Sequence, residues 1–184
     1  ELRQYLDRFT ASGHYLPVEV NVLTLLDSNN LAYSEVLMAM AERLLQELKA
    51  KGIKVPDASL NPIQEWFASS TRVREMFTEA GVGAEASVEL GGGLPGLLRL
   101  ISRVTSSFKT GASTKDAMRI EIRNRFTQLA GAFNALIRSA EKSLDGRRIV
   151  FLIDGTDKLR GKDTEDFFIY DAEQLLTIAT LAIY

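Results

Sequence analysis

The feature that most constrains the fold is a run of five consecutive apolar residues, Ile-Val-Phe-Leu-Ile at 149–153, between Arg148 and Asp154. Most of these residues are β-branched or aromatic, as is typical of strands. A strand with one face in water alternates apolar and polar residues, and this run does not alternate. It therefore predicts a strand that is covered on both faces, as the strands of a parallel sheet are.

Helices and further strands are predicted on both sides of this strand. The helices share an apolar residue every three or four positions, and they cover about 2–11, 32–51, 61–80, 97–108, 113–144 and 164–176. Ser113 is expected to cap the longest helix. Alternating valines predict a strand at Tyr15–Leu23, and another is expected at Ala179–Tyr184. Residues 81–95 are expected to form a loop with a short strand at 87–90. This order of elements predicts an α/β protein.

Composition excludes several classes of protein. The chain has 184 residues, no cysteine and a single histidine, His14. It therefore has no disulfide scaffold, no thiol nucleophile and no pair of histidines for a metalloprotease zinc. No apolar run approaches the roughly 18–20 residues of a membrane span. We expect a cytoplasmic protein with no membrane segment. Because the chain starts at Glu1 and not at Met, we also expect a piece of a longer protein.

Charge is distributed unevenly along the chain. The net charge of −2 hides a segment, residues 99–148, whose formal charge is +7, between two acidic segments. Lys115, Arg119 and Arg123 form a basic row on one predicted helix. Such a row is either a solvated helix face or an anion or partner surface, and the acidic segments of the same chain could also balance it.

Two glycine-containing segments resemble phosphate-binding loops only superficially. Gly91–Gly96 fits G-x-G-x-x-G, but a short acidic segment precedes it and Pro95 removes an N–H donor. Gly155–Lys162 follows a strand, yet its spacing is one residue too long for a P-loop and Asp163 replaces the Ser or Thr that binds Mg²⁺. Neither is predicted to bind phosphate.

The end of the apolar strand carries a third candidate motif. A buried strand that ends in an acid is the Walker B pattern, in which the carboxylate holds the water shell of Mg²⁺. Asp154 stands at this position, and Asp157 follows as a second acid that could activate the attacking water. Ligands of α/β proteins bind at the carboxyl ends of strands, which suits this placement. Alternatively, both residues serve only the turn that follows the strand.

The segment 148–159, RIVFLIDGTDKL, resembles the Walker B segment of P-loop NTPases in the STAND and KAP branches, relatives of the AAA ATPases. The resemblance implies that Asp154 is the magnesium-associated acid and Asp157 the second catalytic acid. Lys158 stands where the NACHT group usually has a further acid, and Gly155 stands where many AAA proteins place the catalytic Glu. Hydrolysis and binding without hydrolysis therefore both stay open.

The same resemblance implies an organisation for the whole chain. Residues 1–52 would form the first part of a parallel-sheet P-loop NTPase-like core, beginning with the helix that follows a Walker A motif. Residues 53–146 would be a large, mainly helical insertion, and 147–184 would hold the Walker B strand, a helix and the start of the sensor strand. The Walker A motif itself would lie upstream of Glu1, so no residue of this chain is assigned to ATP.

These observations lead to two functional hypotheses. The first is part of an ATP-binding or ATPase switch module, a nucleoside-triphosphate hydrolase that uses Mg²⁺ and ATP in the full-length protein and couples nucleotide state to conformation or assembly. This chain alone is then expected to be inactive. The second is a non-enzymatic helical domain that binds a protein partner, another copy of itself or nucleic acid through the basic segment 99–148. In that case Lys115, Arg119 and Arg123 would form the contact surface.

Overall fold

In the computed structural model of the chain, the apolar strand predicted above lies at the centre of a parallel sheet. The structure describes residues 2–26, 31–71, 73, 75, 92–110, 112–158, 165, 169 and 172–183. The sheet consists of β1 (Tyr15–Asn21), β2 (Arg148–Asp154) and β3 (Leu181–Ile183), in the order β1-β2-β3. Both pairs of neighbouring strands are parallel, as the apolar run predicted.

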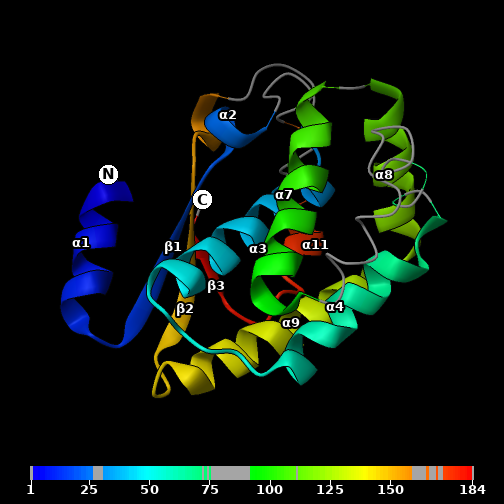
Figure 1. The fold of residues 1–184 in the computed structure, drawn as a ribbon. Helices are drawn as coiled ribbons and strands as arrows, with labels where there is room; N and C mark the ends of the chain where they lie inside the picture. The colour runs from blue at the N-terminus through cyan, green and yellow to red at the C-terminus, as the bar shows by residue number, and fades with distance from the viewer. Residues whose placement is uncertain are drawn as a thin grey trace.

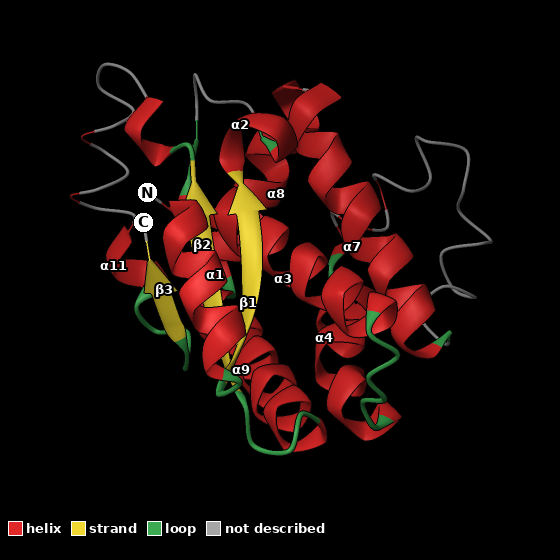
Figure 2. Cartoon of the chain, turned by 90° about the vertical axis from the view of Figure 1, so that its left-hand side faces the viewer, coloured by secondary structure: helices red, strands yellow, loops and turns green. Residues whose placement is uncertain are grey.

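The β2 strand is buried on both faces. Its five residues at 149–153 are at most 1% exposed. Figure 1 shows the reason: α1 (Leu2–Ser12) lies on one side of the sheet, and a layer of helices that includes α3 (Tyr33–Ala50) and α9 (Phe126–Ser143) lies on the other. Figure 2 shows the same arrangement with α1 in front of the strands. The removal of this apolar surface from water on both sides is what stabilises the strand.

Helices make up most of the described chain. The remaining ones are α2 (Val22–Leu25), α4 (Asp57–Ser69), α7 (Gly93–Thr110), α8 (Ala112–Asn124), the 3₁₀ turn η1 (Thr156–Lys158) and α11 (Ala172–Leu175). The α3 helix is central, since it packs against β1, α7 and α8 and most of its side chains are buried. A continuous apolar core includes residues of β1, β2 and the helices α3, α4, α7, α8 and α9. The chain is thus a mostly helical α/β protein with a small parallel sheet.

Several predicted boundaries differ from the observed ones. The strand predicted to reach Leu23 ends at Asn21, because Asn21 caps α2 by accepting a hydrogen bond from Thr24 N–H. The α4 helix begins at Asp57, four residues early, and its regular part ends at Ser69. The α7 helix begins at Gly93, so the last three residues of the loop predicted at 81–95 belong to this helix. The short strand predicted at 87–90 lies outside the described residues.

The largest difference concerns the helix predicted over 113–144. It is two helices, α8 and α9, separated at Arg125, where φ is −121° and ψ is 22°. Because α8 already begins at Ala112, Ser113 lies inside the helix and not at its cap. Of the helix predicted at 164–176, the structure describes residues 165 and 169 and the short α11 near its end.

Arg125 contacts α4 at the interruption between α8 and α9. The Trp66 indole N–H donates to the Arg125 carbonyl (3.4 Å), and the Arg125 guanidinium lies over the Trp66 ring, 5.0 Å from its centroid. Arg125 also donates to Ser69 Oγ (2.7 Å) and pairs with Glu121 (3.1 Å). The backbone groups of Arg125 still bond within the helices, since its N–H donates to the Glu121 carbonyl (3.2 Å) and its own carbonyl accepts from Leu129 N–H (3.2 Å). The contacts with α4 are additional, and they cannot be read from the periodicity of α8 and α9.

Candidate functional site

The carboxyl ends of β1 and β2 bring two polar side chains together. The strand register places Asn21 opposite Asp154, the last residue of each strand. Asn21 Nδ2 donates to Asp154 Oδ2 at 3.1 Å, and the Asp154 carboxylate is half-buried. Asn21 is itself held in place, since its Oδ1 accepts from Thr24 N–H at 3.1 Å. The amide therefore orients the Asp154 carboxylate.

The residue after Asp154 must be glycine. Gly155 has a φ of +87°, and a Cβ atom there would lie 2.7 Å from Leu23 Cγ, closer than side-chain atoms approach one another. The chain then enters η1, in which Lys158 N–H donates to the Gly155 carbonyl (3.2 Å). The turn after the strand is therefore packed tightly against the segment after β1. This packing suits both a fixed ligand site and a purely structural turn.

The second predicted acid is only partly placed. Asp157 lies in η1, three residues after Asp154, and its side chain is not among those the structure describes. Lys158, beside it, is exposed. Among the described residues, no group of three or more His, Cys, Asp or Glu side chains is arranged to hold a metal ion. Any Mg²⁺ at Asp154 would therefore be held mainly by water and by a ligand's own oxygens, as this ion commonly is.

The predicted basic row does not form one surface. Lys115 and Arg119 of α8 point inward to Glu35, in the first turn of α3, whose side chain has no exposed surface. Arg119 Nε donates to Glu35 Oε1 at 2.7 Å, and Lys115 Nζ lies 3.7 Å from the same oxygen. The third member of the row, Arg123, is exposed. The structure brings Lys115 and Arg119 together on one carboxylate and leaves Arg123 apart.

Burial dominates the electrostatics of this cluster. The loss of solvent raises the pKa of Glu35 above its ordinary value, and the positive charges of Arg119 and Lys115 oppose this shift only in part. The other carboxylate oxygen, Oε2, accepts from Ala32 N–H at 3.3 Å. Beyond Arg119 lies Asp116, whose side chain is 71% exposed. Glu35 therefore connects α8 to the beginning of α3.

Other basic side chains of the segment 99–148 also form ion pairs with carboxylates of the same chain. Arg125 pairs with Glu121, and Arg148 Nε donates to Glu141 at 2.9 Å. Together with the Glu35 cluster, these contacts account for part of the segment's positive charge within the chain. The described residues therefore provide no observation that favours nucleic-acid binding by this segment.

Two important residues were not predicted from the sequence. Glu35 lies three residues after the start of a predicted helix and directly before six apolar residues, 36–41, and a charge beside that apolar run was the available signal. Asn21 was one of the two polar residues, with Glu19, that alternate with valines in the predicted strand. Their partners, Arg119 and Asp154, are 84 and 133 residues away in sequence, so only the fold could identify them.

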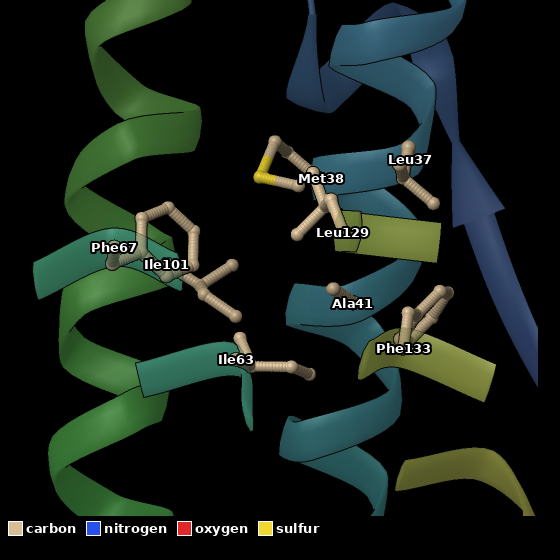
Figure 3. Close-up of a pocket in the computed structure, with 8 residues that line it drawn as sticks. All are labelled: Leu37, Met38, Ala41, Ile63, Phe67, Ile101, Leu129 and Phe133. Carbon is tan, nitrogen blue, oxygen red and sulfur yellow. The ribbon is translucent and has the colours of Figure 1, made fainter. Parts of the chain in front are cut away.

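An apolar cavity in the helical layer is not a ligand site. Figure 3 shows its lining side chains, which come from α3, α4, α7 and α9: Leu37, Met38, Ala41, Ile63, Phe67, Ile101, Leu129 and Phe133. Its volume is ≈ 10 Å³, about that of one water-sized sphere, and no polar atom lines it. It is a packing defect of the core.

Comparisons with known proteins do not assign the chain to a family. No protein-family model matches it, and neither a curated protein nor a solved structure shows significant similarity to it. Within the described part of the chain, every helix is too short or too polar to cross a membrane.

Proposed function

We propose that this chain is part of an ATP-binding switch module of the P-loop NTPase type, in which Asp154 helps to hold the magnesium ion of Mg-ATP. The observation that carries the proposal is the position of Asp154. It ends a buried, central strand of a parallel sheet, at the edge where α/β proteins bind ligands, and Asn21 orients it.

The chemistry of the site supports Mg²⁺ more than other metals. Mg²⁺ prefers oxygen ligands and retains several of its waters, so a single carboxylate with phosphate oxygens is a sufficient set. Asp154 would accept hydrogen bonds from those waters. Asp157, in the turn that follows, would polarise the water that attacks the γ-phosphate. Because the described residues include no group of three or more His, Cys, Asp or Glu side chains that could hold a metal ion, the phosphates and their cradle would supply the remaining contacts.

The edges of the sheet limit where a phosphate-binding strand could join. The outer edge of β1 carries Pro17, which has no N–H to donate, and the Arg43 Nε donates to the Glu19 carbonyl at 2.9 Å. A further strand would therefore join beside β3. Its carboxyl end would then lie at the same edge of the sheet as Asp154, provided that it is also parallel.

The test is Mg²⁺-dependent ATP hydrolysis by the full-length protein. Replacing Asp154 by Asn keeps the shape of the side chain but removes its charge, and we expect hydrolysis to fall roughly 100-fold or more. The control is Asp145→Asn, an exposed residue with a φ of +56° that Asn tolerates. Equal rates in the two variants, or no Mg-ATP binding by the unmodified protein, would contradict the proposal.

A further inference from the structure

The Asn21 side chain is bound at both ends of its amide. Its Oδ1 accepts from Thr24 N–H at 3.1 Å, and its Nδ2 donates to Asp154 Oδ2 at 3.1 Å. Thr24 Oγ1 also donates to the Asn21 carbonyl at 3.1 Å, which holds the backbone of the same residue. The amide is thus attached both to the first turn of α2 and to the end of β2.

The contact with Thr24 determines which end of the amide faces Asp154. A backbone N–H can only donate, so the atom that meets Thr24 N–H must be the amide oxygen. If the amide were turned over, two donors would face each other at α2 and two acceptors would face each other at β2. Asn21 therefore presents an N–H donor to the Asp154 carboxylate, and not an oxygen that could bind a metal.

This arrangement limits the oxygens that the pair can offer to a cation. Mg²⁺ retains several of its waters and needs few protein oxygens, whereas Ca²⁺ takes about six to eight oxygen ligands and often binds both oxygens of one carboxylate. Asp154 Oδ2 accepts from Asn21, and Asn21 Oδ1 accepts from Thr24. A cation that used either oxygen would compete with a hydrogen bond, so the pair suits Mg²⁺ better than Ca²⁺.

We propose that Asn21 is a positioning residue that makes the site selective for a Mg²⁺-bound nucleotide over the Ca²⁺-bound form. Asn21 engages Oδ2 of Asp154, so the carboxylate meets the water shell of the cation through Oδ1. This inference rests on the proposed function, because it concerns the same site, and it adds the choice of cation and the residue that determines it. Replacing a residue that orients a metal-associated side chain typically changes metal affinity about 10- to 100-fold.

The test is binding of the non-hydrolysable ATP analogue AMP-PNP to the full-length protein, measured by isothermal titration in Mg²⁺ and in Ca²⁺. The quantity compared is the ratio of the two dissociation constants. Asn21→Ser keeps an oxygen that can cap α2 but shortens the side chain and removes its N–H donor, so the preference for Mg²⁺ should fall roughly 10-fold. Asn21→Asp also keeps the cap and adds a second carboxylate, so the preference should fall further.

Thr24→Val is the matched control. It removes the bond from Thr24 Oγ1 to the Asn21 carbonyl but keeps both partners of the amide, so the ratio should stay as in the unmodified protein. A merely structural role of Asn21 would weaken binding equally in both cations. An unchanged ratio in Asn21→Ser and Asn21→Asp would therefore overturn this inference and leave the proposed function intact. If the unmodified protein binds no AMP-PNP in Mg²⁺, the proposed function fails, and this inference fails with it.

Discussion

At the scale of single residues, Glu35 is a carboxylate with no exposed side-chain surface. Burial raises its pKa, so the folded chain binds this proton more tightly than the unfolded chain does. The stability that protonation of Glu35 contributes is therefore fully present below the unfolded pKa, about 4.3. It is lost as the pH rises through the folded pKa.

This sign gives a prediction for Glu35→Gln, which cannot ionise. The free energy of unfolding of the unmodified protein, relative to that of the variant, should fall as the pH rises from about 4. It should become constant once Glu35 is ionised in both folded and unfolded chains. Urea unfolding at a series of pH values measures this difference. A difference that grows in favour of the unmodified protein with rising pH would show that Arg119 and Lys115 outweigh burial.

Gly155 offers a second prediction at this scale, because the chain contains a matched glycine. Both Gly155 (φ +87°) and Gly146 (φ +82°) have left-handed backbones, but a Cβ at Gly146 would meet nothing within 4 Å, whereas one at Gly155 would collide with Leu23. Gly146→Ala should therefore cost about 1–2 kcal/mol, the backbone penalty alone. Gly155→Ala should cost about 1–3 kcal/mol more, as overpacking does. Thermal or urea unfolding compares them, and equal costs would contradict the close approach.

At the scale of elements, the sequence predicted best where one pattern decides the structure. The unbroken apolar run made β2 and its parallel pairing predictable, and the stripe of α3 predicted that helix within about a residue. The position of Asp154 at the end of β2 followed directly from this run. One of the two residues in the Asn21–Asp154 hydrogen bond was therefore predictable. Its partner, Asn21, depended on the register between two strands that are far apart in sequence.

Elements shaped by tertiary contacts were predicted less well. The apolar stripe continues from Met118 through Leu144, so periodicity alone gives one helix. At the interruption, the Arg125 carbonyl accepts a hydrogen bond from Trp66, which is 59 residues earlier in the chain. In the same way, Lys115 and Arg119 have the spacing of any solvated helix face, and only the packing of α8 on α3 turns them inward. The local sequence pattern predicts which face of a helix is apolar. It does not predict which residue forms an ion pair with a buried charged side chain.

At the scale of the whole molecule, the two edges of the sheet differ. His14 C=O accepts from Arg148 N–H, so the backbone groups of alternate β1 residues point toward β2, and those of Tyr15, Pro17 and Glu19 point away. No strand of the described residues pairs with this edge of β1. An unpaired edge is a template for association with another chain unless it is blocked. Pro17 removes one donor from the edge, and Arg43 occupies the Glu19 carbonyl.

Removing both blocks should therefore change how the molecule associates. In the double variant Pro17→Val, Arg43→Ala, the edge gains an N–H donor and a free carbonyl acceptor, so we expect concentration-dependent self-association through β1 that the unmodified chain does not show. Sedimentation velocity over a range of concentrations measures it. Pro17→Val, Arg99→Ala removes the same charge from the exposed surface of α7 and should associate less, because Arg43 still covers Glu19. If both double variants sediment like the unmodified chain, then the covering of the edge depends on more than Pro17 and Arg43, and growth of the sheet beside β3 loses its main structural argument.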